Sequence, residues 1–297
     1  LKGDDVHRYE TLKSDKFVIF PYFRKIEDGK EKAELYSEKE LQKLFPKGYG
    51  YLKECEPVLR NREKGRLQND EFWYRYIYPK NLTLFDKEKL IQPDISMGCN
   101  FAYDGNGEFY STTTNYSYKK YDHIKESYKF YMAILNSKVL WWYLQQTGTT
   151  MANGFFRFKP DYINPFPLPK IENIEDTKPF EVLVDYVMFL KQQEFFKNDD
   201  LAFAKDRLMV SFFERLIDCM VYELYFGDEL HKANKYFIEP LQKENLPEIE
   251  SMSNKLESIK TIFERLNDKN HTIKKNMYFI DSVEVVRIIE GKENANN

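Results

Sequence analysis

The pattern of apolar and polar residues changes character near residues 170–178. Before this point, short apolar runs are interrupted by proline, glycine and asparagine. Beyond it, apolar residues recur every three to four positions over long stretches, a spacing typical of amphipathic helices. The pattern therefore predicts two domains of different architecture, over residues 1–170 and residues 171–297.

Several segments of the first part show features of strands. Residues 16–20 (KFVIF) predict a strand that ends at Pro21, and residues 89–91 (KLI) predict a strand edge before Pro93. Residues 155–158 alternate in the manner of a strand. A Gly-Asn-Gly sequence at 105–107 separates two short candidate strands, residues 100–104 and 108–112, and predicts a hairpin.

Helical spacing occurs in the first part as well. Residues 38–45 predict a short helix that Ser37 caps. Residues 51–62 form an amphipathic stretch in which Pro57 leaves the middle uncertain, because proline removes a helical hydrogen bond. Residues 124–144 predict one helix with a single apolar face.

The second part predicts helices almost throughout. Residues 180–190 and 209–224 each carry an apolar stripe, the second ending at Gly227, and residues 229–244 and 252–266 share the spacing. The predicted fold class is therefore α+β: a mixed domain with antiparallel hairpins and helices, followed by a mainly α-helical C-terminal domain.

Composition and charge limit the kinds of molecule that the chain is expected to bind and the compartment in which it is expected to act. The net charge is −3, but residues 1–170 hold 28 Lys and Arg against 23 Asp and Glu, so the basic excess lies in the first part. Aromatic residues make up 16% of the chain, and they can serve a core or stack on nucleic acid. No apolar run approaches the roughly 20 residues of a membrane span. Three separated cysteines favour a reducing cytoplasm over a disulfide framework.

Motifs for catalysis are weak. The glycines near residue 105 lie in a predicted hairpin, whereas a nucleoside cofactor needs a glycine-rich turn between a strand and a helix. Asn164-Pro165-Phe166-Pro167 departs from the amide, double-proline and aromatic order of amino-methyltransferases acting on flipped bases. The four histidines lack metal-ligand spacing, and neither Pro93-Asp94 nor Pro160-Asp161 opens a convincing nuclease site. We therefore expect a binding segment with no catalytic residues, metal or cofactor of its own.

Three basic or small polar segments are candidates for contact with DNA, since phosphates and base edges are bound by Arg, Lys, Asn and hydroxyl groups. For the first segment the alternative is a solvated surface, and for the second the alternative is that its polar residues complete the predicted hairpin. The candidate residues are Arg60, Asn61, Arg62, Lys64 and Arg66 in the first segment; Thr112, Thr113, Thr114, Asn115, Lys119 and Lys120 in the second; and Thr149, Thr150, Asn153, Arg157 and Lys159 in the third.

A series of short blocks, in order over residues 1–170, resembles one family. The blocks are KGDDVHRY at 2–9, YL at 51–52 with LRNR at 59–62, WY at 73–74 with YPKNL at 78–82, LF at 84–85, KLIQPDIS at 89–96, NFAYD at 100–104, GEFY at 107–110, AILNSK at 133–138, FRF at 156–158 and PFPLP at 165–169. Together they resemble the TaqI-like C-terminal specificity domain of adenine-specific DNA methyltransferases, especially fused type IIG restriction-modification enzymes of bacterial defence. Residues 213–225 are similar to the helical segment that ends these enzymes.

The resemblance implies a division of labour. An upstream domain would bind S-adenosylmethionine and methylate adenine, and in fused enzymes a nuclease lies further upstream. This chain, which begins at Leu1, is then expected to be the part that grips double-stranded DNA and reads its sequence while the base is flipped. A scaffold that docks a partner subunit of a restriction or defence complex is the rival hypothesis, and a free-standing enzyme is a third.

Overall fold

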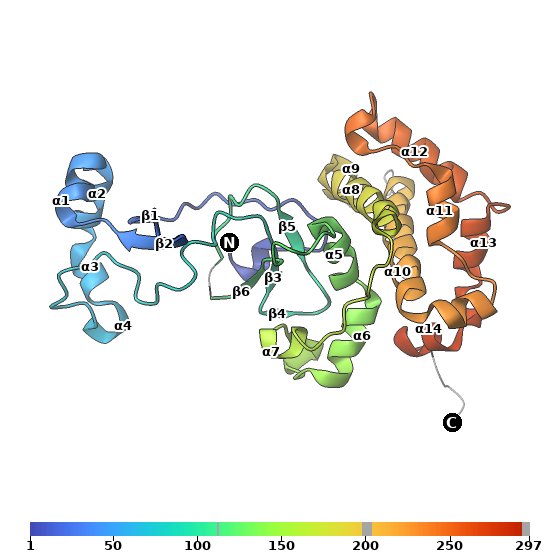
Figure 1. Cartoon of the computed structure of the whole chain (residues 1–297), viewed down its shortest axis with the longest axis horizontal. Helices are drawn as coiled ribbons and strands as arrows, with labels where there is room; N and C mark the ends of the chain where they lie inside the picture. The colour runs from blue at the N-terminus through green and yellow to red at the C-terminus, as the bar shows by residue number, and fades with distance from the viewer. Residues whose placement is uncertain (112, 198–203, 293–297) are drawn as a thin grey trace. The chain divides into compact units, whose positions relative to one another are not determined.

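The computed structural model describes residues 1–111, 113–197 and 204–292, which form two compact units (Figure 1). Unit 2 comprises residues 15–87 and 106–110. Unit 1 comprises residues 1–14, 88–105 and 111–297. The chain thus begins in unit 1, leaves it to build unit 2, and returns.

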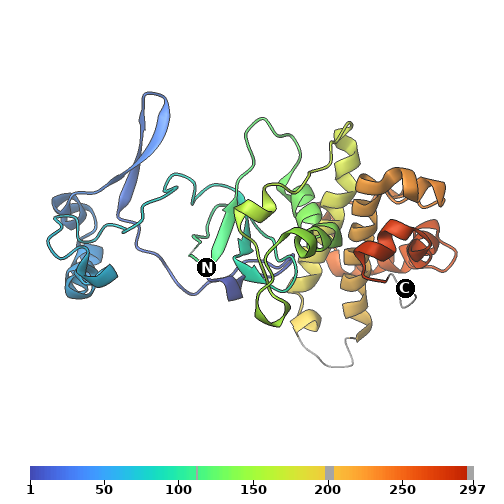
Figure 2. The same ribbon diagram turned by 90° about the horizontal axis from the view of Figure 1, so that it is seen from below.

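Unit 2 combines a two-stranded ribbon with short helices. β1 (Tyr22–Glu27) pairs antiparallel with β2 (Lys30–Leu35), and the ribbon is seen along its length in Figure 2. Four short helical segments follow: α1 (Glu38–Leu44), α2 (Pro46–Glu54), α3 (Glu56–Arg60) and α4 (Arg62–Gly65). The small core of unit 2 consists of Leu41, Leu52, Trp73 and Tyr74.

The sequence predictions for unit 2 were partly right. The helix beginning at Glu38 is confirmed, and Ser37 caps it through a capping box with Glu40. The predicted strand at residues 16–20 is wrong: strand β1 begins only after Pro21. Phe17 is 98% exposed, so this segment has no buried face to fix a strand. The stretch at 51–62 is broken at Cys55, where α2 ends just before Pro57.

Unit 1 contains a small antiparallel sheet. β3 (Lys89–Pro93) is its central strand, between β5 (Ala102–Asp104) and β6 (Asn115–Tyr118). A separate pair joins β4 (Ile95–Ser96) to β7 (Phe156–Arg157). The strands at 89–91 and 155–158 are therefore confirmed, although β3 is central and not at an edge.

The predicted hairpin around residues 105–107 is wrong. β5 pairs with β3, and residues 108–110 belong to unit 2 without forming a strand. Gly107 has a φ of +67°, and a Cβ there would lie 2.3 Å from the Asp86 carbonyl. The glycine therefore permits a close crossing of two segments of unit 2, a contact that its local sequence does not reveal.

The helices of unit 1 begin with α5 (Tyr128–Leu135) and α6 (Lys138–Thr147). They replace the single helix predicted over residues 124–144. The chain turns at Asn136, whose side chain exchanges hydrogen bonds with the backbone of Phe101, and Ser137 then caps α6. The three-to-four spacing of apolar residues continues across this break because each of the two helices buries one apolar face.

The remaining helices confirm the mainly helical character of the C-terminal part. α10 is kinked at Phe226, next to the end predicted at Gly227, and a further helical stretch follows the kink as far as Lys232. The helices are α7 (Pro160–Ile163), α8 (Lys178–Gln192), α9 (Glu194–Lys197), α10 (Ala204–Lys232), α11 (Ile238–Glu244), α12 (Lys255–Leu266), α13 (Thr272–Tyr278) and α14 (Glu284–Ile289). The α+β fold class is therefore confirmed.

One apolar core runs through unit 1, from the sheet to the C-terminal helices. Helix α8 packs on both α5 and α10 (Figure 1). The N-terminal segment joins the same assembly: Lys191 donates to the carbonyl of Arg8, and Arg8 pairs with Glu214. The predicted boundary at 170/171 lies within this compact unit, and it stays a prediction of where two functional parts meet.

Candidate nucleic-acid interface

The first candidate segment lies in unit 2, and two of its arginines bind the protein's own backbone. The Arg60 guanidinium donates to the carbonyls of Gln68 and Asp70 at 3.1 and 2.9 Å. It also donates to the Glu56 carboxylate at 2.7 Å. Arg60 therefore holds the loop that follows α4 and has few donors left for a phosphate.

Arg62 has the same role on the next part of that loop. Its guanidinium donates to the carbonyls of Leu59, Trp73 and Arg75 at 2.9, 3.0 and 2.9 Å. Burial lowers the pKa of this guanidinium from its ordinary value, as expected where protein groups replace water. The two arginines thus anchor the segment at 67–75 against the end of α3.

The other three candidates of this segment are exposed. Asn61, Lys64 and Arg66 lie on the turn that Arg60 and Arg62 hold. Arg66 donates to the Tyr78 hydroxyl at 3.3 Å, and its guanidinium lies 5.3 Å from the Tyr78 ring centroid. An exposed guanidinium resting on an aromatic ring keeps donors available for an anion.

The second and third candidate segments meet in unit 1, around Asp94. The Asp94 N–H donates to the carbonyl of Thr114 at 2.8 Å, and its carbonyl accepts from Phe158 N–H at 2.7 Å. The Arg157 guanidinium binds the Asp94 carboxylate with Nη2 to Oδ2 at 2.9 Å and Nε to Oδ1 at 3.2 Å. We call Asp94, Thr114, Asn115 and Arg157 the Asp94 junction.

Electrostatics at the Asp94 junction follow from this geometry. The hydrogen bonds that the Arg157 guanidinium donates to the Asp94 carboxylate raise the pKa of the guanidinium above its ordinary value. The Arg157 side chain nevertheless remains 38% exposed, whereas that of Asp94 is 12% exposed. The carboxylate therefore orients a cation that still faces solvent, an arrangement suited to holding an anion.

The residues of the second segment differ in their exposure and in their hydrogen bonds. Thr112 lies outside the described residues, and Thr113 is exposed. Thr114 accepts a hydrogen bond from the N–H of Gly3 at 3.0 Å. Asn115 is buried, and its amide donates to the carbonyl of Leu1 at 3.0 Å. Thr114 and Asn115 thus tie the start of the chain to β6.

The two lysines of this segment line a hollow of about 570 Å³ in unit 1. Lys119 pairs with Asp122 at 2.9 Å, and this hydrogen bond raises the pKa of the lysine. Lys120 donates to the carbonyl of Glu126 at 2.8 Å and lies over the ring of Tyr128. Lys120 is therefore largely committed to the loop before α5, and Lys119 is the more accessible of the two.

The third segment surrounds β7. Thr149 shares a 2.6 Å hydrogen bond with the Tyr162 hydroxyl, and Thr150 forms an isolated bridge with Phe156. Asn153 is exposed with a φ of +61°, and Lys159 directly precedes α7. The segment therefore presents one exposed amide and shapes the approach to Arg157.

Asp94 is the residue of the candidate interface that the sequence analysis did not single out for contact with DNA. Its sequence signals are the Pro93-Asp94 pair, which fails as a nuclease site, and its place in the KLIQPDIS block that resembles the family. Because β3 places Asp94 between β6 and β7, Asp94 forms hydrogen bonds with Thr114 and Arg157, which are 20 and 63 positions away in the sequence. Long-range strand pairing of this kind leaves no local signature.

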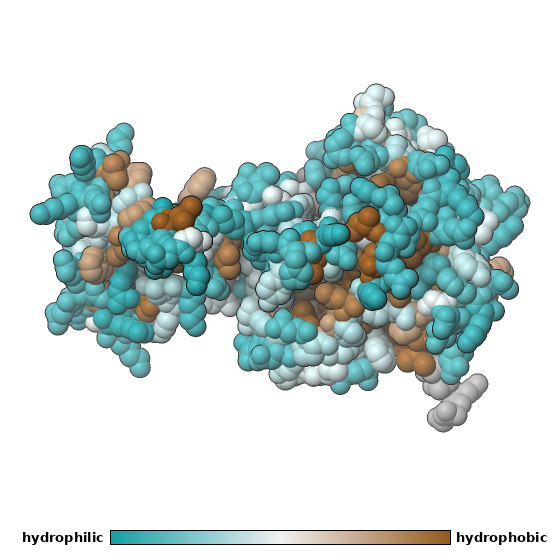
Figure 3. All heavy atoms as spheres, viewed as in Figure 1, coloured by the Kyte–Doolittle hydropathy of each residue, from teal (hydrophilic) through white to brown (hydrophobic). Residues whose placement is uncertain are grey.

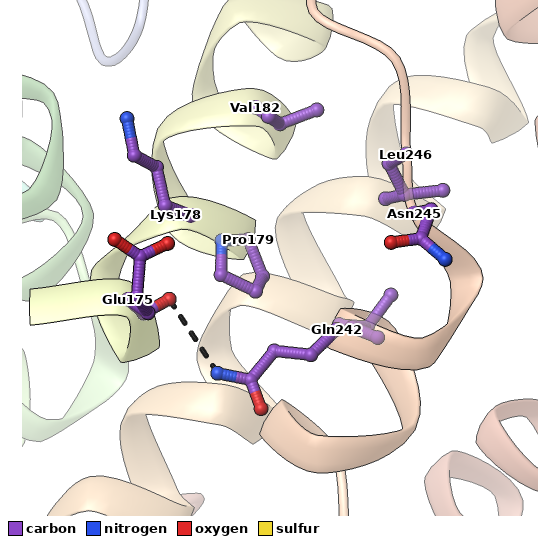
Figure 4. Close-up of a pocket in the computed structure, with 8 residues that line it drawn as sticks. Glu175, Lys178, Pro179, Val182, Gln242, Asn245 and Leu246 are labelled. Carbon is purple, nitrogen blue, oxygen red and sulfur yellow. Dashed lines mark hydrogen bonds between the residues drawn. The ribbon is translucent and has the colours of Figure 1, made fainter. Parts of the chain in front are cut away.

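A second hollow, of about 310 Å³, lies between η3 (Ile174–Thr177), the start of α8 and the end of α11 (Figure 4). Gln242 spans it, donating to the carbonyl of Glu175 at 3.4 Å and to the carboxylate of Asp176 at 2.9 Å. Val182 and Leu246 supply an aliphatic wall. These bonds join helices to each other, so we assign this hollow to packing.

Three further observations concern the surface, the metal-binding side chains and the hydrophobicity of the helices. On the face of unit 1 seen in Figure 3, apolar residues appear only between hydrophilic ones. In the parts of the chain that the structure describes, His, Cys, Asp and Glu side chains nowhere gather into a group that could hold a metal ion. No helix within those parts is both long and apolar enough to cross a membrane.

Comparison with known families gives a match that covers more than half of the chain. The model of the TaqI-like C-terminal specificity domain matches residues 1–168. The match includes every candidate residue of the three segments and all of the Asp94 junction. The chain therefore belongs to the TaqI-like C-terminal specificity domain family, whose members recognise specific DNA sequences in restriction-modification enzymes.

Proposed function

We propose that this chain reads a double-stranded DNA sequence on behalf of an S-adenosylmethionine-dependent domain that methylates adenine and precedes it in the same polypeptide. The family match over residues 1–168 carries the proposal. The enzyme would act in the cytoplasm as part of a bacterial defence system of type IIG. The two buried thiols, Cys99 and Cys219, agree with a reducing compartment.

Two surfaces support the DNA-binding role. In unit 1, the Asp94 junction holds Arg157 partly exposed, and Thr113 and Thr114 of the second segment are exposed as well. In unit 2, Asn61, Lys64 and Arg66 are exposed on one short turn. Guanidinium, ammonium and hydroxyl groups are the usual donors to phosphate oxygens, and an amide can also read a base edge.

The salt dependence of duplex binding tests the DNA-binding part of the proposal. Each phosphate contact releases counterions, so the logarithm of affinity should fall with the logarithm of salt concentration, with a slope of about −0.9 per contact. Fluorescence anisotropy with 30-base-pair duplexes of random sequence measures this slope. Selection from the same pool should then enrich one motif. Absence of binding at low salt, or selection of no motif, would contradict the proposal.

The partnership with a methyltransferase needs a separate experiment. The reading frame upstream of Leu1 should encode a glycine-rich cofactor loop and an amide, double-proline and aromatic tetrapeptide. The complete polypeptide should transfer a labelled methyl group from S-adenosylmethionine to adenine in duplexes that carry the selected motif. Transfer to cytosine, or an upstream frame without such a domain, would refute this part and leave the DNA-reading role intact.

A further inference from the structure

The turn at residues 61–66 has an unusual backbone. Glu63 and Lys64 have φ values of +50° and +61°, and Gly65 has a φ of +81°. Three consecutive residues are therefore left-handed, and two of them carry side chains that disfavour this region. We call residues Asn61–Arg66 the left-handed turn.

Such a turn persists only where the surroundings hold it, and here they do. The Arg60 and Arg62 guanidinium groups bind six backbone carbonyls around it. Within the turn, Gly65 N–H donates to the carbonyl of Asn61 and Arg66 N–H to that of Arg62, both at 3.1 Å. The six carbonyls belong to Leu59 and to the segment at 67–75, so the two arginines anchor the chain on both sides of the turn.

The exposed side chains of the turn are left available. Among the described residues, Lys64 and Asn61 have no side-chain hydrogen-bond or ion-pair partner, and Arg66 only rests against Tyr78. A lysine at a position that favours glycine or asparagine costs stability, and within the described parts of the chain Lys64 gains no side-chain hydrogen bond or ion pair in return. The Lys64 ammonium is thus present at a position where it does not stabilise the fold.

We propose that the left-handed turn is a DNA-contacting element in which Lys64 and Arg66 bind phosphates and Asn61 contacts a base edge. Arg60 and Arg62 are positioning residues in this scheme. The inference rests on the proposed function and adds to it the division of one basic cluster into contacting and positioning residues. It also identifies a contact made by unit 2.

Lys64→Gly tests the proposal because stability and binding should move in opposite directions. Glycine relieves the left-handed strain, which should raise the folding equilibrium constant of unit 2 by roughly tenfold. Duplex affinity should fall, and the salt slope should become shallower by about 0.9, the value for one phosphate. Lys64→Arg, which keeps the charge, should preserve the slope.

Glu63→Gly is the matched control, since it relieves the same strain one residue earlier but removes a negative charge. It should stabilise unit 2 to a similar extent and leave duplex affinity equal or higher. The probe is the random 30-base-pair duplex, with the 297-residue chain at several salt concentrations. Stability is read by hydrogen exchange of amides in unit 2.

Three outcomes would overturn the inference. Lys64→Gly with unchanged affinity and slope would remove Lys64 from the interface, while steep salt dependence of the unaltered chain would keep the proposed function. Equal losses for Glu63→Gly and Lys64→Gly would assign the effect to turn geometry and not to the lysine. No duplex binding by the unaltered chain would refute the proposed function and this inference together.

Discussion

The ion pair between Lys89 and Asp104 should be essential to the sheet that carries the Asp94 junction. The two residues face each other across β3 and β5, with Nζ 2.5 Å from Oδ2. Their side chains are only 3% and 2% exposed. Lys89→Met keeps the length and apolar stem of the side chain but leaves the Asp104 carboxylate buried without this ammonium.

The expected cost follows from that burial. Removing one partner of a buried pair destabilises a protein by about 3–5 kcal/mol, because the other charge stays in the interior. For a domain of 150–250 residues, each kcal/mol lowers the melting temperature by about 2–4 °C, so a shift on the order of 10 °C is expected. Urea unfolding followed by circular dichroism gives the free energy directly.

Two comparisons make this prediction sharp. The double variant Lys89→Met/Asp104→Leu removes both charges and should recover most of the loss, since apolar pairs often replace buried ion pairs at little cost. Lys243→Met breaks a pair with Glu239 whose side chains are 71% and 64% exposed, and it should cost under about 0.5 kcal/mol. The reasoning is wrong if Lys89→Met costs no more than Lys243→Met, or if the double variant is less stable than Lys89→Met.

Three further substitutions have defined outcomes. Burial raises the pKa of the Asp218 carboxyl above its ordinary value of 3.8. The contribution of Asp218 to the stability of the folded protein therefore declines as pH rises above about 4. Asp218→Asn should abolish that decline in melting scans from pH 4 to 8. Gly107→Ala should destabilise unit 2 by about 1–3 kcal/mol, as measured by hydrogen exchange, because the added Cβ would meet backbone at 2.3 Å. Gly29→Ala should cost about 1 kcal/mol, because the space around Gly29 is open and only the backbone conformation is unfavourable. Arg62→Ala removes three bonds to carbonyls and should cost about 2–3 kcal/mol in urea unfolding, against under about 0.5 kcal/mol for Arg66→Ala.

Local patterns predicted the elements whose causes are local. The helix after Ser37 was predictable because a capping box needs only residues three positions apart. The C-terminal helices were predictable because their apolar stripes span several turns. The strand at residues 16–20 failed for the complementary reason: apolar residues alone do not form a strand where no partner strand covers them.

Pairing between distant segments could not be predicted. β5 was expected to pair with the segment that follows it, but it pairs with β3, and β6 takes the other side of that strand. The Asp94 junction depends on this arrangement, because β3 ends next to Asp94. Sequence reasoning found Thr114, Asn115 and Arg157 separately and had no means to place them next to one another at the end of β3.

The basic cluster at residues 60–66 shows why charge in a sequence is a poor guide to a binding surface. In the sequence, Arg60 and Arg62 are basic residues of the same cluster as Lys64 and Arg66. In the structure, however, the guanidinium groups of Arg60 and Arg62 donate hydrogen bonds to backbone carbonyls. Because a guanidinium has five donors in a fixed fork, it can organise a loop as readily as it can bind a phosphate. The backbone conformation supplies the missing criterion. A cation held at a strained position without a partner of its own has a cost that the fold does not recover, and a ligand is the physical reason to retain it.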